Sequence, residues 1–344
     1  MGSVSTKSDH SSSSSSSSSG SYRRRAHYSG SWYDADPNAL NETLSAFLSN
    51  AVTTPTTPTT AAAATPPSTN RLRALISPHA GYSYSGPTAA YAYQALHKEL
   101  GDPHSPIQSI LVLHPSHHVH LLTCAVSAAT HLETPLGPLT VNDALRQEIL
   151  QLGSNFTVMT QAVDEEEHSG ELQYPYLAKI CQDCHKKQVS VLPVMCGALS
   201  CASEQAVGRQ LAAIVARPEI LTVVSTDFCH WGSRFSYQPT PPAPAPGRNF
   251  VPKATPLHEF IRTMDRRGMD LIELQRPGAF SDYLKETKNT VCGRHAVAVW
   301  MRAVEAATGG ANLQVTFVRY AQSSAATAMS DSSVSYAAAV ATSL

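Results

Sequence analysis

Short apolar runs and amphipathic helical patterns alternate along most of this chain. Candidate strands cover residues 72–77, 109–113, 189–195, 221–225 and 313–318. Candidate helices cover residues 37–48, 87–99, 142–152, 170–181, 204–216, 256–266 and 294–307. Several of the strands are apolar throughout, which is typical of strands covered on both faces. The sequence therefore predicts an α/β fold with a mixed, mostly parallel sheet flanked by helices.

Three stretches of biased composition divide the chain. A serine-rich segment cannot bury a core, so we predict a disordered tail over residues 1–25. Stretches rich in Pro, Thr and Ala at about 52–70 and 240–252 are predicted to be surface insertions, because proline blocks both helix and ladder hydrogen bonds. We interpret residues 26–344 as a single domain that carries both insertions.

Composition and charge limit the classes of binding partner and the cellular compartment that we expect. The 344 residues are 42% hydrophobic and carry a formal net charge of -1, which favours a large core and gives no electrostatic reason to expect nucleic acid as a partner. We expect no transmembrane span and no secretory signal, because the apolar runs are too short. The expected location is the cytoplasm, with the nucleus as a further one, and the cysteines are expected to be thiols there.

The N-terminal residues MGSVST match the N-myristoylation pattern, with Gly2 and a hydroxyl at the sixth position. Arg23, Arg24 and Arg25 would supply the second, basic signal that one acyl chain needs for stable anchoring. A chance match in a disordered tail accounts for the same pattern. Contact with a membrane is therefore expected only if Gly2 is acylated.

Polar side chains follow the predicted strands directly. His79 comes after the first of them, His117 and His118 after the second, and Asp227 and His230 after the fourth. Ligand sites in open α/β sheets lie beyond the carboxyl ends of the strands. The sequence therefore predicts that these side chains gather at one edge of the sheet.

With Cys292, these residues form the richest set for chemistry. Imidazole and thiolate ligands favour iron, copper or zinc over magnesium or calcium. Two histidines and one anion would leave coordination positions open, and Asp227 and His230 would act as outer partners or proton carriers. The alternative is a group of ordinary core and turn histidines, since the chain has 15 of them.

Two further segments carry motifs. The acidic run 164–171 is interpreted as a loop entering a helix capped by Ser169, with His168 and Glu171 as acid/base or outer groups in the crevice. The run CQDCH at 181–185 has the spacing of covalent haem attachment. We interpret it as the end of a helix with surface thiols, because haem attachment of that kind belongs outside the cytosol.

Longer motifs of this chain resemble those of the Memo family, which takes its name from a mediator of receptor-driven cell motility. The resemblance runs from about residue 26 to the C-terminus. Its motifs are AHYSGSWY (26–33), SPHAGYSYSG (77–86), HPSHH (114–118), EEHSGELQYPY (166–176), STDFCHWG (225–232), VCGRH (291–295), YAQSS (320–324) and DSSVSYAA (331–338).

The resemblance implies a fold similar to that of the class III extradiol, non-haem iron dioxygenases. It also implies that His79, His117 and Cys292 occupy the metal-ligand positions, with Asp227 and His230 lining the same pocket. Those dioxygenases use a carboxylate where this chain has Cys292. A thiolate is softer and can be oxidised, which favours iron or copper and counts against ordinary catechol cleavage.

Three functions remain open at this point. The first is a metal-binding protein with a redox-linked role in iron or copper handling, reactive-oxygen chemistry and signalling to the cytoskeleton. The second is a non-catalytic module for phosphotyrosine peptides of receptors or adaptors, with Arg294 and His295 as anion contacts. The third is a dioxygenase of a small aromatic substrate, with His230 or His168 as the base.

Overall fold

The computed structural model describes residues 21–53, 70–186, 188–241, 255–307 and 313–344. Its main element is a nine-stranded mixed sheet in the order β10-β12-β2-β9-β3-β8-β4-β7, with β11 paired to β12, and a smaller sheet has the order β1-β5-β6. The strands of both sheets are β1 (Tyr22–Arg24), β2 (Leu72–Ser77), β3 (Ser109–Pro115), β4 (Cys124–Val126), β5 (Ala129–Leu132), β6 (Leu139–Thr140), β7 (Phe156–Val158), β8 (Ser190–Cys196), β9 (Ile220–Ser225), β10 (His230–Trp231), β11 (Leu313–Gln322) and β12 (Ser333–Ser343).

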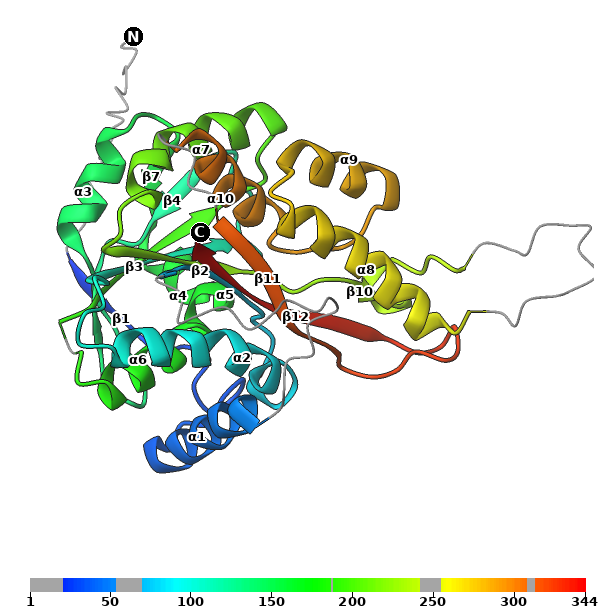
Figure 1. The fold of residues 1–344 in the computed structure, drawn as a ribbon, viewed down its shortest axis with the longest axis horizontal. Coiled ribbons are helices and arrows are strands. Elements are labelled where there is room, and N and C mark those ends of the chain that lie inside the picture. The colour runs from blue at the N-terminus through cyan, green and yellow to red at the C-terminus, as the bar shows by residue number, and fades with distance from the viewer. Residues whose placement is uncertain (1–20, 54–69, 187, 242–254, 308–312) are drawn as a thin grey trace, which may run out of the picture.

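Helices cover both faces of the main sheet (Figure 1). On one face α2 packs against β2 and β12, and α1 and α6 pack against α2. On the other face α10 packs against β3, β8 and β9, with α7 and α9 beside it. The helices of the described residues are α1 (Pro37–Thr53), α2 (Tyr82–Gly101), α3 (Asp143–Gln151), α4 (Gln161–Glu166), α5 (His168–Glu171), α6 (Tyr174–Asp183), α7 (Cys201–Val215), α8 (Leu257–Glu273), α9 (Pro277–Thr287) and α10 (Arg294–Ala306).

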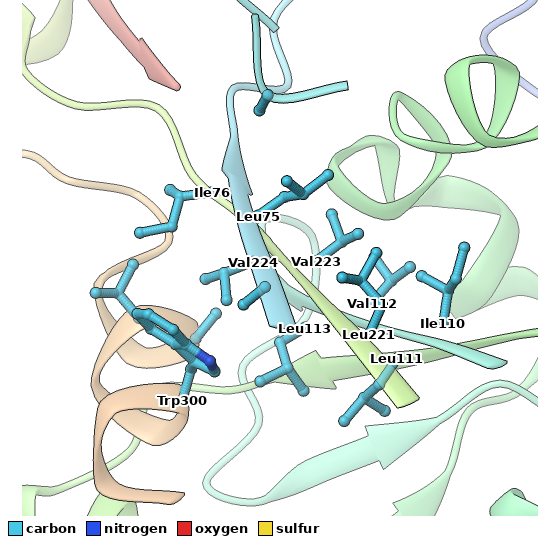
Figure 2. Close-up of a cluster of buried hydrophobic side chains, with 14 of the residues drawn as sticks. Leu75, Ile76, Ile110, Leu111, Val112, Leu113, Leu221, Val223, Val224 and Trp300 are labelled. Carbon is cyan, nitrogen blue, oxygen red and sulfur yellow. The ribbon is translucent and has the colours of Figure 1, made fainter. Parts of the chain in front are cut away.

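The centre of the sheet is parallel and buried on both faces. β2, β9, β3 and β8 are parallel neighbours, whereas β12 and β4 pair with them in the antiparallel sense. Leu75, Val223 and Leu113 have no exposed surface, and Trp300 of α10 lies beside these strands in Figure 2. Burying such side chains supplies the largest favourable term in folding, about 1.5–3 kcal/mol for each. The predicted mixed α/β architecture is confirmed.

Regular structure extends into the predicted tail and into the first predicted insertion. Regular structure begins with β1, inside the predicted tail 1–25, because β1 pairs in parallel with β5. Helix α1 continues to Thr53, inside the predicted insertion 52–70. The serine run, most of both insertions and Gly2 lie outside the described residues.

The interpretation of Arg24 as part of a basic membrane signal is wrong. Its guanidinium is 1% exposed and forms ion pairs with Asp164 and Glu171. A side chain committed to buried carboxylates cannot reach a lipid surface. None of the helices in the described part of the chain has the length and apolar character needed to cross a bilayer.

The predicted helix 170–181 is two helices, α5 and α6. Pro175 occupies the first turn of α6, where its missing N–H costs nothing, whereas within one continuous helix it would remove a backbone hydrogen bond. The cap of α5 is also not Ser169 but Glu167, whose carboxylate accepts the Ser169 N–H. The CQDCH run ends α6 as predicted, but Cys181 is buried rather than a surface thiol.

Candidate metal centre

Three site residues occupy the same place relative to their strands. His79, His117 and Asp227 each lie two residues beyond the end of β2, β3 and β9, which are parallel neighbours. The carboxyl ends of parallel strands meet at one edge, so the fold gathers these side chains there. His230 begins the short strand β10, and Cys292 lies two residues before α10. These five residues therefore lie together at one edge of the sheet.

Three ligand-type atoms converge at this edge. The ligand atoms of His79, His117 and Cys292 all lie within 4.8 Å of one another. The Sγ atom of Cys292 is 3.1 Å from Nε2 of His79 and accepts the Asp227 N–H at 3.3 Å. Gly293 permits this position, because a Cβ atom there would lie 2.3 Å from the carbonyl oxygen of Ser225.

The hydrogen bonds around His79 fix its tautomer. The hydroxyl of Ser225 donates to the carbonyl of Ser169 at 2.8 Å and accepts the amide of Gln173 at 2.9 Å. With its only proton already donated, Ser225 can only accept from Nδ1 of His79, 2.8 Å away. The neutral imidazole of His79 therefore carries its proton on Nδ1 and presents a free Nε2 lone pair to Cys292.

Glu167 orients His117 in the same way. Its carboxylate accepts both Nδ1–H, at 2.8 Å, and the backbone N–H of His117, at 2.6 Å. Burial opposes the ionised form, but the hydrogen bond and charge of His117 outweigh it and hold the pKa of Glu167 well below its usual range. Burial lowers the pKa of His117, yet hydrogen bonds to Cys292 and Glu167 raise it to about 10. Nε2 of His117 thus also faces Cys292.

Asp227 and His230 form a second group around the same thiol. Their ligand atoms and Sγ of Cys292 lie within 4.8 Å of one another. Asp227 accepts the backbone N–H of His79 at 2.9 Å, while burial raises its pKa to about 7. Nδ1 of His230 donates to the carbonyls of Phe228 and Thr290, at 2.9 and 3.1 Å, which frees its Nε2. Burial lowers the pKa of His230, so the imidazole is neutral near pH 7.

A cavity of about 530 Å³ opens over these groups. His168 lies in its wall, with ring centroids 4.4 Å from His117 and 4.5 Å from Trp32. Burial and the neighbouring charge of His117 lower the pKa of His168 to about 3. The other residues of the wall include aromatic, serine and arginine side chains, among them Tyr84, Arg234, Phe235, Ser323 and Tyr336.

Four predicted site residues lie elsewhere. The carboxylate of Glu171 is fully buried against Arg24 and the hydroxyl of Tyr33, outside the cavity. His295 pairs with Glu204 of α7 at 2.7 Å, and Arg294 is an exposed residue of α10; neither lines the cavity. His118 is exposed and also lies outside the cavity, with its ring centroid 6.1 Å from that of His168 in an edge-on arrangement.

Several functional neighbours were not predicted. Ser225 and Gln173 set the tautomer of His79, and Arg234 supplies a cation at the cavity wall. Ser225 and Gln173 lie within the STDFCHWG and EEHSGELQYPY motifs, but nothing in the sequence pairs either residue with His79. Arg234 follows the STDFCHWG motif by two residues, and that proximity was its one available signal.

The fold and the site together define an α/β protein with a pocket of imidazoles and one carboxyl group at the carboxyl edge of its sheet, beside the thiol of Cys292. The family model described as Memo-like protein matches residues 24–340. The chain therefore belongs to the Memo family.

Curated relatives match over nearly the whole chain. Protein MEMO1 of Mus musculus and of Homo sapiens are each 39% identical over 316 residues, covering 92% of this chain and 96% of theirs. Protein memo-1 homolog of Caenorhabditis elegans is 37% identical, covering 93% of this chain and 82% of its own. The crystal structure of an uncharacterized protein from Escherichia coli K12 aligns with 78% of this chain and 99% of its own, at 17% identity and a TM-score of 0.46, too distant to inform the site.

Proposed function

We propose that this chain holds one iron or copper ion at His79, His117 and Cys292 and uses it in a redox-linked role. The observation that carries the proposal is the direction of the two imidazoles. Outer partners, Ser225 and Glu167, hold each Nδ1, so that both Nε2 atoms face the Cys292 thiol. Metal-ligating histidines are held by the same kind of outer hydrogen bond.

The donor set supports the choice of metal. Imidazole and thiolate suit iron, copper and zinc, and three protein ligands leave coordination positions open to the cavity. Bound iron or copper would supply one-electron chemistry, whereas zinc would supply none. Asp227 and His230 stand beside the same thiol and hold or accept protons there. Metal handling, reactive-oxygen chemistry and signalling to the cytoskeleton, in the cytoplasm and nucleus, are the roles we propose for this pocket.

Metal content tests this proposal. The native chain, purified under reducing conditions and loaded with iron or copper, is expected to hold about one ion, and Cys292→Ala is expected to lose it. Cys201→Ala is the matched control, because Cys201 is an exposed thiol at the start of α7. Elemental mass spectrometry gives the ratio. A native chain without metal, or equal metal in both variants, contradicts the proposal.

A second candidate is a binding module for phosphotyrosine peptides. One observation favours it: the cavity wall joins the aromatic side chains of Trp32 and Tyr84 to the guanidinium of Arg234. An aryl phosphate needs such an aromatic and cationic wall. Binding of a phosphotyrosine peptide that persists in Cys292→Ala and in metal-free protein would favour this candidate over the first.

A further inference from the structure

A buried carboxylate lies behind the pocket wall. Asp265 of α8, which packs against β11 (Figure 1), has no exposed surface and does not line the cavity. Its Oδ1 accepts the amide of Asn289 at 2.8 Å and its Oδ2 accepts the hydroxyl of Tyr320 at 2.9 Å. The hydroxyl of Tyr320 also shares a hydrogen bond with the hydroxyl of Ser335 at 3.0 Å. Two donors from two separate segments thus converge on this carboxylate, and one of them links it to β12.

One of these segments carries Cys292. Asn289 precedes Thr290, whose hydroxyl oxygen accepts the backbone N–H of His230 at 2.7 Å and whose carbonyl accepts Nδ1 of His230 at 3.1 Å. Two residues further along, Cys292 presents its thiol to His79. The position of Asn289 therefore sets where this loop begins its approach to the metal ligands.

Another segment carries Asp227 and His230. Cys229 lies between them, and its carbonyl accepts the N–H of Ser335 at 2.9 Å. The N–H of Phe228 in turn donates to the carbonyl of Ser335 at 2.8 Å. Asp265 reaches this contact through Tyr320, whose hydroxyl donates to Oδ2 of Asp265 at 2.9 Å and shares a hydrogen bond with the Ser335 hydroxyl at 3.0 Å. The carboxylate is thereby connected to the contact between the loop 227–230 and β12.

We propose that Asp265 is a positioning residue for the metal centre, joining the loop that carries Cys292 to the loop that carries Asp227 and His230. This inference relies on the proposed function only for the claim that the two loops hold a metal. The positions of the loops follow from the contacts described above. An ionised carboxylate accepts from Asn289 at one oxygen and from Tyr320 at the other, whereas an asparagine amide has a donor at one of its two ends. Among the partners that the described residues give Asp265 there is no Lys or Arg, so the structure retains an isolated buried charge at this point. Burying an unpaired charge costs free energy. A role in positioning the two loops explains why a carboxylate lies here.

The first arm of the test measures the loops without metal. Asp265→Asn is expected to raise backbone hydrogen exchange in residues 227–231 and 288–293, relative to the amides of α2. Ile272→Ala is the matched control, because Ile272 is a buried apolar residue of the same helix and its loss acts through packing alone. Both variants are compared where circular dichroism shows them folded. Equal exchange in the two loops for both variants would assign Asp265 a merely structural role.

The second arm uses Co²⁺ alone as the probe, followed by the absorption band between cobalt and the Cys292 thiolate. Loss of an outer partner typically weakens a metal site about 10–100-fold, and we expect that loss and a shifted band in Asp265→Asn but not in Ile272→Ala. Unchanged affinity and an unchanged band in Asp265→Asn overturn the inference. A native chain that binds no Co²⁺ contradicts the proposed function instead, and the exchange arm still decides the role of Asp265.

Discussion

Replacement of Arg24 by alanine is expected to lower the free energy of unfolding by about 3–5 kcal/mol, because it leaves buried carboxylates without their cation. The guanidinium lies between Asp164, at 3.0 Å, and Glu171, at 2.5 Å, and both carboxylates are almost wholly buried. It also donates to the carbonyls of Asp164 and Glu167. Arg24 therefore connects β1 to residues 164–171, the segment in which Glu167 orients His117.

Denaturation by urea measures this loss, and Arg23→Ala is its control. Arg23 pairs with Glu133, but its side chain is 51% exposed, so the pair is screened by water and worth about 0–1 kcal/mol. The two substitutions remove the same side chain from adjacent residues of one strand. Equal losses of stability would mean that burial of the Arg24 ion pairs contributes nothing.

Glu167→Gln is expected to weaken metal binding about 10–100-fold while leaving all three ligands in place. The carboxylate holds the Nδ1–H and the backbone N–H of His117, and it also caps α5 through the Ser169 N–H. An amide cannot accept all of these bonds, since one end of it donates. His117 would then lose its fixed direction toward Cys292. Titration with Cu⁺ or Fe²⁺ under reducing conditions measures the affinity.

The control is Glu166→Gln, the same substitution at an exposed neighbour. The dependence of stability on pH also distinguishes native protein from Glu167→Gln. The folded pKa of Glu167 is depressed, so the carboxylate contributes stability above its ordinary pKa of about 4.3 and loses it as the pH falls below that value. The stability difference between native protein and Glu167→Gln should therefore shrink only as the pH falls below about 4.3. A constant difference, or equal metal affinity in both variants, would contradict the role given to Glu167.

Much of the sheet could be predicted because its central strands are apolar throughout. The bounds predicted for β2 match the structure, and those of β3, β8 and β9 differ by one or two residues. A strand that is buried on both faces is a continuous apolar run, and such a run is easy to recognise in a sequence. The site followed from the same signal, since His79, His117 and Asp227 stand just beyond strand ends.

Elements that depend on distant partners were not predicted. β12 reads SVSYAAAVATS, and its alanine run has helical propensity. Pairing with the preceding strand β11 and with β2, which is far away in sequence, overrides that propensity. α9 and the short strands β4 and β7 were missed as well, because elements of that length carry little periodicity.

The predicted site residues that lie outside the cavity share one physical cause. Glu171 was placed in the crevice because it follows His168 on a short helix, yet it bonds Arg24, 147 residues away. His295 was grouped with Cys292 by adjacency, but the start of α10 turns its ring toward Glu204. Neighbouring residues on a helix face different directions, so adjacency to a ligand does not place a side chain in the pocket.

X-ray absorption at the edge of the bound metal tests the central claim most directly. The site at His79, His117 and Cys292 predicts one sulfur at about 2.3 Å and imidazole nitrogens at about 2.0 Å, distances typical of thiolate and histidine ligands. The sulfur should disappear from the spectrum of metal that remains in Cys292→Ala. A shell of oxygen and nitrogen alone in the native protein, or a sulfur that persists in the variant, would contradict the account.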